Sequence, residues 1–147
     1  MLFESCVDSL DAALASVAGG ARRLELCAHV EVGGTSPDPL LVSQALENLV
    51  DNSIRFAPSG SRVEVSARGG DGACRLVVHD EGPGIPEEER AKVFEPFYRG
   101  STPGSQTGLG LAFVADVARK HGGEARLLPS ASGTTVAIEL PCGRRSV

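Results

Sequence analysis

Apolar residues recur every three or four positions in three stretches, which predicts helices over residues 4–18, 39–56 and 109–121. The second stretch carries the strongest helical pattern. Asp38 can cap its start, and Pro39 is tolerated in a first turn because its missing N–H would have no partner there. A shorter helix is expected at residues 87–94.

Apolar and polar positions alternate in five other stretches, which predicts strands over residues 23–30, 62–68, 74–80, 124–128 and 134–140. Gly-rich turns at 69–72 and around Gly133 join two pairs of these strands as hairpins. Helices and strands therefore alternate, and the hairpins make the sheet mixed. We expect one α/β domain over residues 1–147.

Composition narrows the class of protein. Hydrophobic residues make up 41% of the 147 residues, enough for one core, and aromatic residues only 4%. A formal net charge of −5 without a basic cluster argues against a nucleic-acid partner. The N-terminus has neither a basic segment nor a long apolar run, so we expect neither a signal peptide nor a membrane contact.

The four cysteines lie far apart in the chain, without a Cys-x-x-Cys pair. This spacing favours reduced thiols in a cytoplasmic protein over a zinc site or a disulfide scaffold. His29 on a strand and His121 at a helix end are interpreted as structural. His79 lies on an apolar strand and not on an exposed helix, so we do not expect it to be a phosphate acceptor.

Asn48 and Asn52 lie four positions apart on the strongest predicted helix, so their side chains share one face. Carboxamide oxygens are neutral, hard ligands that suit magnesium. Arg55 points to the same side, where it could meet a terminal phosphate, and Phe56 could cover a purine ring. The alternative is a solvent-facing polar surface beside a core Phe.

Asp80 ends an apolar strand and is followed by Gly82 and Gly84. A carboxylate in a pocket can accept a hydrogen bond from the exocyclic amine of adenine, and the glycines allow the backbone to turn closely against a ligand. Asp80 is therefore a candidate base selector. By itself, this motif is also an ordinary turn signal.

A glycine-rich stretch enters the third predicted helix directly and comprises Thr107, Gly108, Leu109, Gly110 and Leu111. The first amides of a helix and its positive dipole end attract phosphate. The stretch matches neither the dinucleotide-binding fingerprint nor the Walker loop. Alone it is a weak signal.

Taken in order, these motifs resemble those of the catalytic, ATP-binding domain of bacterial sensor histidine kinases, relatives of the gyrase B and MutL ATPase domains. The asparagine box is similar to residues 48–56, the first glycine box to 80–84, the phenylalanine box to 94–99 and the second glycine box to 108–111. The turn at 133–135 is similar to the last glycine-containing turn of the family. The phenylalanine box is the part that gyrase-like and anti-sigma relatives lack. Ser53 stands where the family usually has Ala.

The resemblance implies an α+β two-layer sandwich of the Bergerat type. A mixed five-stranded sheet would carry about three helices on one face, and a mobile lid would run from about residue 85 to 107. The implied cofactors are ATP and magnesium, with Asn52 and Asn48 as metal ligands. The implied catalytic residues are Asn48, Arg55 and Arg99. The implied nucleotide contacts are Asn48, Asn52, Arg55, Phe56, Asp80, Gly82, Gly84, Ile85, Phe94, Phe97, Thr107, Gly108, Leu109, Gly110, Leu111 and Thr134.

The implied activity is a histidine protein kinase that donates the γ-phosphoryl group of ATP to a histidine on a separate dimerisation domain, with a response regulator further along the pathway. Residues 1–39 leave no room for that domain, so we expect a monomeric, cytoplasmic catalytic half of a longer kinase, which could belong to a membrane receptor. Two alternatives stay open: a free-standing serine kinase or ATPase of the anti-sigma type, and a non-catalytic nucleotide-binding module.

Overall fold

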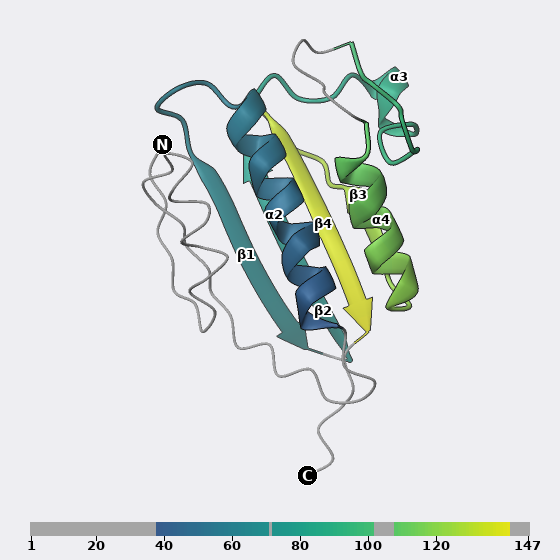
Figure 1. The fold of residues 1–147 in the computed structure, drawn as a ribbon. Helices are drawn as coiled ribbons and strands as arrows, with labels where there is room; N and C mark the ends of the chain where they lie inside the picture. Colours follow the sequence, from purple (N-terminus) through teal and green to yellow (C-terminus); the bar gives the residue numbers. More distant parts are fainter. Residues whose placement is uncertain (1–37, 71, 102–107, 142–147) are drawn as a thin grey trace.

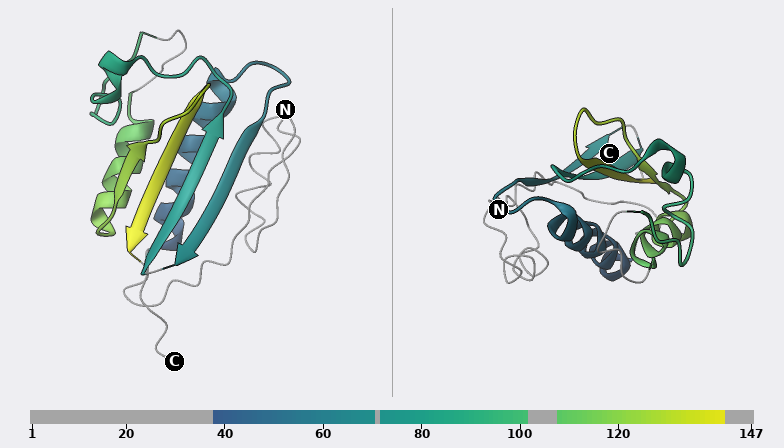
Figure 2. Two further views of the ribbon diagram at one scale, coloured as in Figure 1. Left: turned by 180° about the vertical axis from the view of Figure 1, so that it is seen from behind. Right: turned by 90° about the horizontal axis from the view of Figure 1, so that it is seen from above.

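The computed structural model describes residues 38–70, 72–101 and 108–141, which form a sheet with helices on one face (Figure 1). The view from above in Figure 2 places the two long helices, α2 and α4, on the same side of the sheet. In chain order the elements are α2 (Pro39–Phe56), β1 (Val63–Gly70), β2 (Ala73–Asp80), α3 (Glu87–Arg90), α4 (Gly110–Lys120), β3 (Glu124–Leu127) and β4 (Thr134–Pro141).

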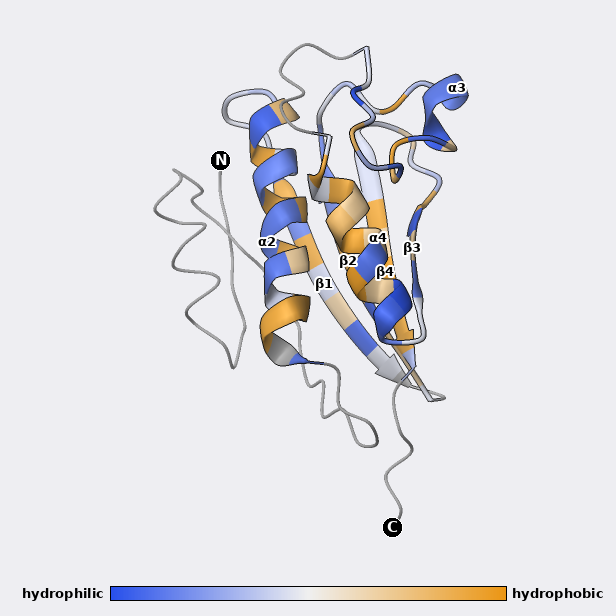
Figure 3. Cartoon of the chain, turned by 45° about the vertical axis from the view of Figure 1, so that its right-hand side comes forward, coloured by the Kyte–Doolittle hydropathy of each residue, from blue (hydrophilic) through white to orange (hydrophobic). Residues whose placement is uncertain are grey.

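Helix α2 begins and ends where its sequence predicts. The Asp38 carboxylate accepts the N–H of Leu40 at 2.9 Å, and Pro39 occupies the first turn. The apolar residues of α2 fall on one stripe, visible as alternating orange and blue bands along the helix in Figure 3. Ala45 and Leu49 on this stripe are 0% and 2% exposed. The stripe fixes the face that α2 turns toward the sheet.

The four described strands lie in the order β1-β2-β4-β3, and all three pairings are antiparallel. This differs from the expected mixed sheet of five strands. The β1–β2 and β3–β4 hairpins each pair their strands antiparallel. After β2 the chain crosses over through α4 and enters β3 at the edge of the sheet, and β4 then fits between β2 and β3. The predicted helix 4–18 and strand 23–30 lie outside the described residues. The α+β two-layer class is confirmed, while the described sheet is antiparallel.

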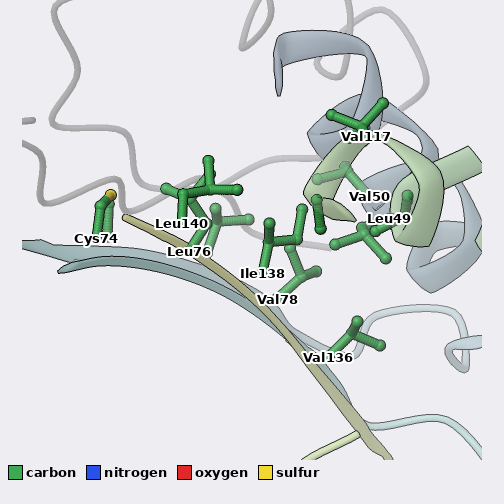
Figure 4. Packing of buried hydrophobic residues seen from close by; sticks show 14 of the residues in the cluster. Leu49, Val50, Cys74, Leu76, Val78, Val117, Val136, Ile138 and Leu140 are labelled. Atoms are coloured by element: carbon green, nitrogen blue, oxygen red, sulfur yellow. The ribbon is translucent and has the colours of Figure 1, made fainter. Parts of the chain in front are cut away.

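The core lies between the sheet and the helix pair (Figure 4). Val78 on β2 and Ile138 on β4 point from the sheet toward the helices, and Leu49 on α2 and Val117 on α4 belong to the same buried cluster. All four side chains are at most 2% exposed. Aliphatic residues therefore supply the packing, in agreement with the low aromatic content.

His121 joins the start of α2 to the end of α4. Its Nδ1 lies 2.6 Å from the carbonyl oxygen of Val117, and its Nε2 lies 2.8 Å from the amide nitrogen of Asp38. A carbonyl only accepts, so Nδ1 carries the proton, and Nε2 accepts the N–H of Asp38. The neutral imidazole thus holds one end of the antiparallel helix pair closed.

Within the described part of the chain, no helix is both long enough and apolar enough to cross a membrane.

Candidate functional site

The other end of the helix pair opens on a pocket of about 450 Å³. This volume lies in the range of small-molecule sites, about 300–1,000 Å³. Its walls come from the second half of α2, the end of β2, the start of β4, the start of α4 and the segment between α3 and α4. Elements distant in sequence therefore contribute to one cavity.

Asp80 is the buried charge of this pocket, with 5% of its surface exposed. Its Oδ1 accepts the N–H of Gly82 at 2.8 Å. Burial raises the pKa of the Asp80 carboxyl above its ordinary value, while hydrogen bonds from Gly82, the Ser53 hydroxyl and the backbone of Thr134 oppose that rise. The Asp80 carboxylate is therefore buried and held by the turn that follows β2.

Gly82 is required by this arrangement. A Cβ at Gly82 would lie 2.7 Å from Oδ1 of Asp80 and 3.1 Å from the carbonyl oxygen of Phe56. The missing side chain thus allows the chain to turn beneath the carboxylate, as the sequence predicts. Gly82 supports Asp80 from behind and does not itself line the pocket.

Three polar side chains of α2 reach the pocket. Asn48 and Asn52 are half-buried and Arg55 is exposed, all on the face that borders the cavity. The start of α4 lies against Asn52, since a Cβ on Gly110 would be 3.3 Å from its Nδ2. The pocket therefore joins neutral carboxamides, one guanidinium and a helix start.

The first turn of α4 suits an anion. It has no acidic residue and no side-chain cap, and α4 has 11 residues. Gly108 just before it adopts a φ of +67°, and a Cβ there would lie 2.5 Å from the carbonyl oxygen of Tyr98. A glycine is therefore needed where the chain passes closely under the preceding loop.

Hydrogen bonds join the segment after α3 to α3 itself and to the residues just before α4. The N–H of Ser101 donates to Oε1 of Glu89 at 3.0 Å. The Ser101 hydroxyl first, and this N–H second, lower the pKa of the Glu89 carboxyl. The N–H of Phe97 donates to the carbonyl of Gly108 at 2.9 Å. Phe97 adopts a φ of +64° and is 74% exposed, an uncommon backbone conformation for an aromatic residue. This segment connects the pocket rim to the start of α4.

Most of the predicted contact residues line the pocket. They are Asn48, Asn52, Arg55, Phe56, Asp80, Gly84, Ile85, Gly108, Leu109, Gly110, Leu111 and Thr134. Among the others, Phe94 packs against the core, while Phe97 and Arg99 are exposed and outside the lining. Thr107 and the rest of residues 102–107 lie outside the described residues.

Several lining residues were not expected from the sequence, among them Asp51, Ser53, Glu89, Val93 and Tyr98. Ser53 could have been found from its position, since it lies four residues after Leu49 on the buried stripe of α2, where an apolar residue is usual. Tyr98 belongs to the irregular segment after α3, and Glu89 to the four-residue helix α3, so neither lies in a stretch long enough to show a sequence period. The pocket rim therefore carries more acidic and aromatic character than the motifs indicate.

The family model described as histidine kinase-, DNA gyrase B-, and HSP90-like ATPase matches residues 37–144. A second model, described as the CutC family, matches residues 1–71, less than half of the chain. The two matches overlap at 37–71, where the described residues form α2 and β1 of the two-layer domain.

Sequence relatives agree with the first match. The chain is 46% identical over 110 residues to the signal transduction histidine-protein kinase/phosphatase MprB of Mycobacterium leprae, covering 68% of this chain and 21% of that protein. It is 36% identical over 119 residues to the sensor histidine kinase GtrS of Pseudomonas aeruginosa, covering 77% of this chain and 24% of that one. The chain thus spans about a fifth to a quarter of these relatives.

Solved structures show the same likeness. A mycobacterial sensor histidine kinase MprB structure superposes with a TM-score of 0.64 at 45% identity, covering 71% of this chain and 72% of that one. The catalytic domain of the histidine kinase ThkA superposes with a TM-score of 0.64 at 31% identity, covering 71% and 68%. Both cover a similar share of this chain.

Proposed function

Because the chain belongs to the family of histidine kinase-, DNA gyrase B-, and HSP90-like ATPases, which implies ATP binding, we propose that its pocket holds magnesium-ATP for phosphoryl transfer to a histidine. The acceptor histidine belongs to a separate dimerisation domain of a two-component kinase. The observation that carries the proposal is the convergence of Asp80, the asparagines of α2 and the start of α4 on one cavity. We assign the ATP-binding domain to residues 38–141 at least, and its extension back to residue 1 stays a prediction.

Asp80 would recognise the base. Its carboxylate lies at the inner wall of the pocket and can accept a hydrogen bond from the 6-amino group of adenine. Guanine carries an oxygen at this position, which a carboxylate would repel. Phe56, Ile85 and Val136 provide apolar surface around the ring. The pocket thereby favours adenine among purines.

The start of α4 and Arg55 would hold the phosphates. The uncapped first turn offers backbone amides and the positive end of the helix dipole. Arg55 adds a mobile guanidinium at the exposed rim. These groups supply local positive potential in a chain whose formal net charge is −5.

The donor set near the phosphate end fits magnesium. No group of three or more His, Cys, Asp or Glu in the described residues could hold a metal ion. Asn52 and Asn48 instead offer neutral oxygen ligands, and magnesium commonly completes its shell with water and nucleotide phosphates. The metal, when bound with ATP, would neutralise the charge of the phosphates.

In the proposed reaction, an imidazole nitrogen of the acceptor attacks the γ-phosphorus. A P–N bond forms, the bond to the β–γ bridging oxygen breaks, and ADP leaves with that electron pair. The residues of this chain position the nucleotide and balance its charge, which is the main demand of phosphoryl transfer. The acceptor, the response regulator and a cytoplasmic location belong to the proposal, as does a monomeric state of the isolated chain.

Isothermal titration with magnesium-ATP tests the site, and labelled ATP with a separately purified histidine-bearing dimerisation domain tests the activity. We expect Asp80→Asn to weaken ATP binding by roughly 10- to 100-fold, the value of a hydrogen bond to a charged group. Equal affinity of Asp80→Asn and the unchanged chain would refute the base contact. Tight ATP binding with no transfer to any histidine domain would favour a non-catalytic nucleotide-binding module.

A further inference from the structure

Glu89 is a carboxylate in the pocket wall to which the proposed function gives no role. It is half-buried and lies on α3, beyond the end of the helix pair at which the pocket opens (Figure 1). A site for a polyanion is weakened by a further carboxylate unless hydrogen-bond donors reach it, because like charges repel. Besides the 6-amino group assigned to Asp80, the donors of ATP are its two ribose hydroxyls. Glu89 is therefore a candidate acceptor for the sugar.

Contacts on either side place Glu89 between the base end and the phosphate end of the pocket. The neighbouring Arg90 donates from Nε to the carbonyl oxygen of Ile85 at 3.2 Å, and Ile85 belongs to the apolar surface proposed for the ring. On the other side, the N–H of Phe97 donates to the carbonyl oxygen of Gly108, just before α4 starts. The ribose of a nucleotide likewise lies between its base and its phosphates, so the position of Glu89 suits the sugar.

The Glu89 carboxylate is held in place and still has acceptor capacity. Its Oε1 accepts the N–H of Ser101 at 3.0 Å, and its Oε2 lies so close to Gly100 that a Cβ there would be 2.5 Å away. The Ser101 hydroxyl, followed by this N–H, lowers the pKa of the carboxyl and so keeps it ionised at neutral pH. An ionised carboxylate accepts at about four positions, so these two donors leave about half of them for a ligand.

We propose that Glu89 is a specificity-determining residue that accepts a hydrogen bond from a ribose hydroxyl, so that the pocket favours ribonucleotides over deoxyribonucleotides. The inference rests on the proposed function, because it takes the ribose from an ATP whose base contacts Asp80. Asp51, another acidic residue of the lining, suits the sugar less: it is exposed and lies one turn before Arg55 on α2, the residue proposed for the phosphates. Tyr98 also brings a hydroxyl to the pocket wall, and the test separates it from Glu89.

The test compares nucleotides that differ in one hydroxyl. Isothermal titration of the full chain with magnesium gives its affinities for ATP, 2′-deoxy-ATP and 3′-deoxy-ATP, and the ATP affinity is divided by each of the other two. Glu89→Ala should lower at least one of these ratios about two- to tenfold, the range of one hydrogen bond. Glu89→Gln keeps a neutral acceptor oxygen, so its ratio should fall between those of Glu89→Ala and the unchanged chain.

A merely structural role of Glu89, through its hold on Ser101, would weaken all three nucleotides equally and leave both ratios unchanged. Glu88→Ala is the matched control for the loss of a negative charge, since Glu88 lies on the same helix but is exposed and outside the pocket lining. It should keep both ratios. Unchanged ratios in Glu89→Ala, or a fall in Tyr98→Phe in place of Glu89→Ala, would overturn the inference.

Asp80→Asn separates the role of Glu89 from the proposed function. If this variant retains full ATP affinity, the base contact on which the proposed function depends is wrong, whatever the ratios in Glu89→Ala. If Asp80→Asn shows its expected loss of ATP affinity while Glu89→Ala keeps both ratios, only the role of Glu89 is rejected.

Discussion

The two ends of the α2/α4 helix pair satisfy their polar groups in opposite ways. At the closed end, His121 uses both ring nitrogens on groups of the chain itself, at 2.6 and 2.8 Å. At the pocket end, Asn48, Asn52 and Arg55 border a cavity, and α4 starts without a side-chain cap. One end of the same helix pair is thus completed internally, and the other is left for a ligand to complete.

The difference is visible in two aspartates. Burial at the pocket end raises the pKa of the Asp80 carboxyl, so keeping this carboxyl ionised in the folded chain costs stability. On α4, Asp116 pairs with Lys120 at 2.7 Å and Arg119 at 3.2 Å, and these partners lower the pKa of its carboxyl. The ionised Asp116 carboxylate therefore stabilises the folded chain, whereas the ionised, buried Asp80 carboxylate destabilises it and is available to a ligand.

Breaking the closed end should produce the largest loss of stability. Gly123 follows α4, and a Cβ there would overlap the carbonyl oxygen of Glu139 on β4. Gly123→Ala should therefore lower the free energy of unfolding by at least about 3 kcal/mol. Urea denaturation measures this change.

Gly60→Ala provides the control for that substitution. Gly60 has a φ of +81° with no atom within 4 Å of the added Cβ, so only backbone strain of about 1–2 kcal/mol is expected. If both variants lost the same free energy of unfolding, the close approach of Gly123 to β4 would not contribute to stability.

Removing the histidine bridge should have a moderate effect on stability and little on binding. His121→Ala leaves the amide of Asp38 and the carbonyl of Val117 to water, for a loss of about 1 kcal/mol. ATP affinity should stay within about twofold, because His121 is absent from the pocket lining. Thermal unfolding and isothermal titration measure the two quantities, and a tenfold loss of affinity would show that the two ends are coupled.

Local patterns were enough to predict most of the elements. Asp38 and Pro39 marked the start of α2, and all described strands lie within two residues of their predicted bounds. The predicted motifs also supplied most of the pocket lining, and the two glycine boxes lie where β2 ends and where α4 starts. The structural interpretation of His121 is confirmed by its two hydrogen bonds.

Contacts between layers could not be predicted in this way. Ser53 and Asp80 line the same pocket only because α2 packs over β2, and the spacing of residues along the chain does not predict how these two elements pack. Tyr98 reaches the pocket and its neighbour Arg99 does not, since the segment after α3 follows no regular backbone. The strand order, with β4 between β2 and β3, likewise depends on how the α4 crossover packs.

Without ATP, the free energy of unfolding should depend on pH because the folded chain buries the Asp80 carboxylate. The folded state raises the pKa of Asp80, so it binds this proton more tightly than the unfolded state does. As the pH falls from neutral through that raised pKa, the unchanged chain should therefore gain stability relative to Asp80→Asn. Urea denaturation of both across this range measures the difference, and a relative loss toward acid would contradict the burial of a costly charge at the pocket end.

Asp116 should show the opposite sign and the smallest effect. Its lowered pKa means that its ionised form stabilises the folded chain above the ordinary Asp range near roughly 4, and that this contribution is lost as the pH falls through the lowered value. Asp116→Asn should thus lower the unfolding midpoint slightly at neutral pH, by less than His121→Ala does, and the difference should vanish in acid. Because its partners are largely exposed, high salt should remove the same difference. A midpoint difference that persists in acid or in high salt would mean that Asp116 acts through packing, and the contrast between a paired charge on α4 and a buried charge in the pocket would then rest on Asp80 alone.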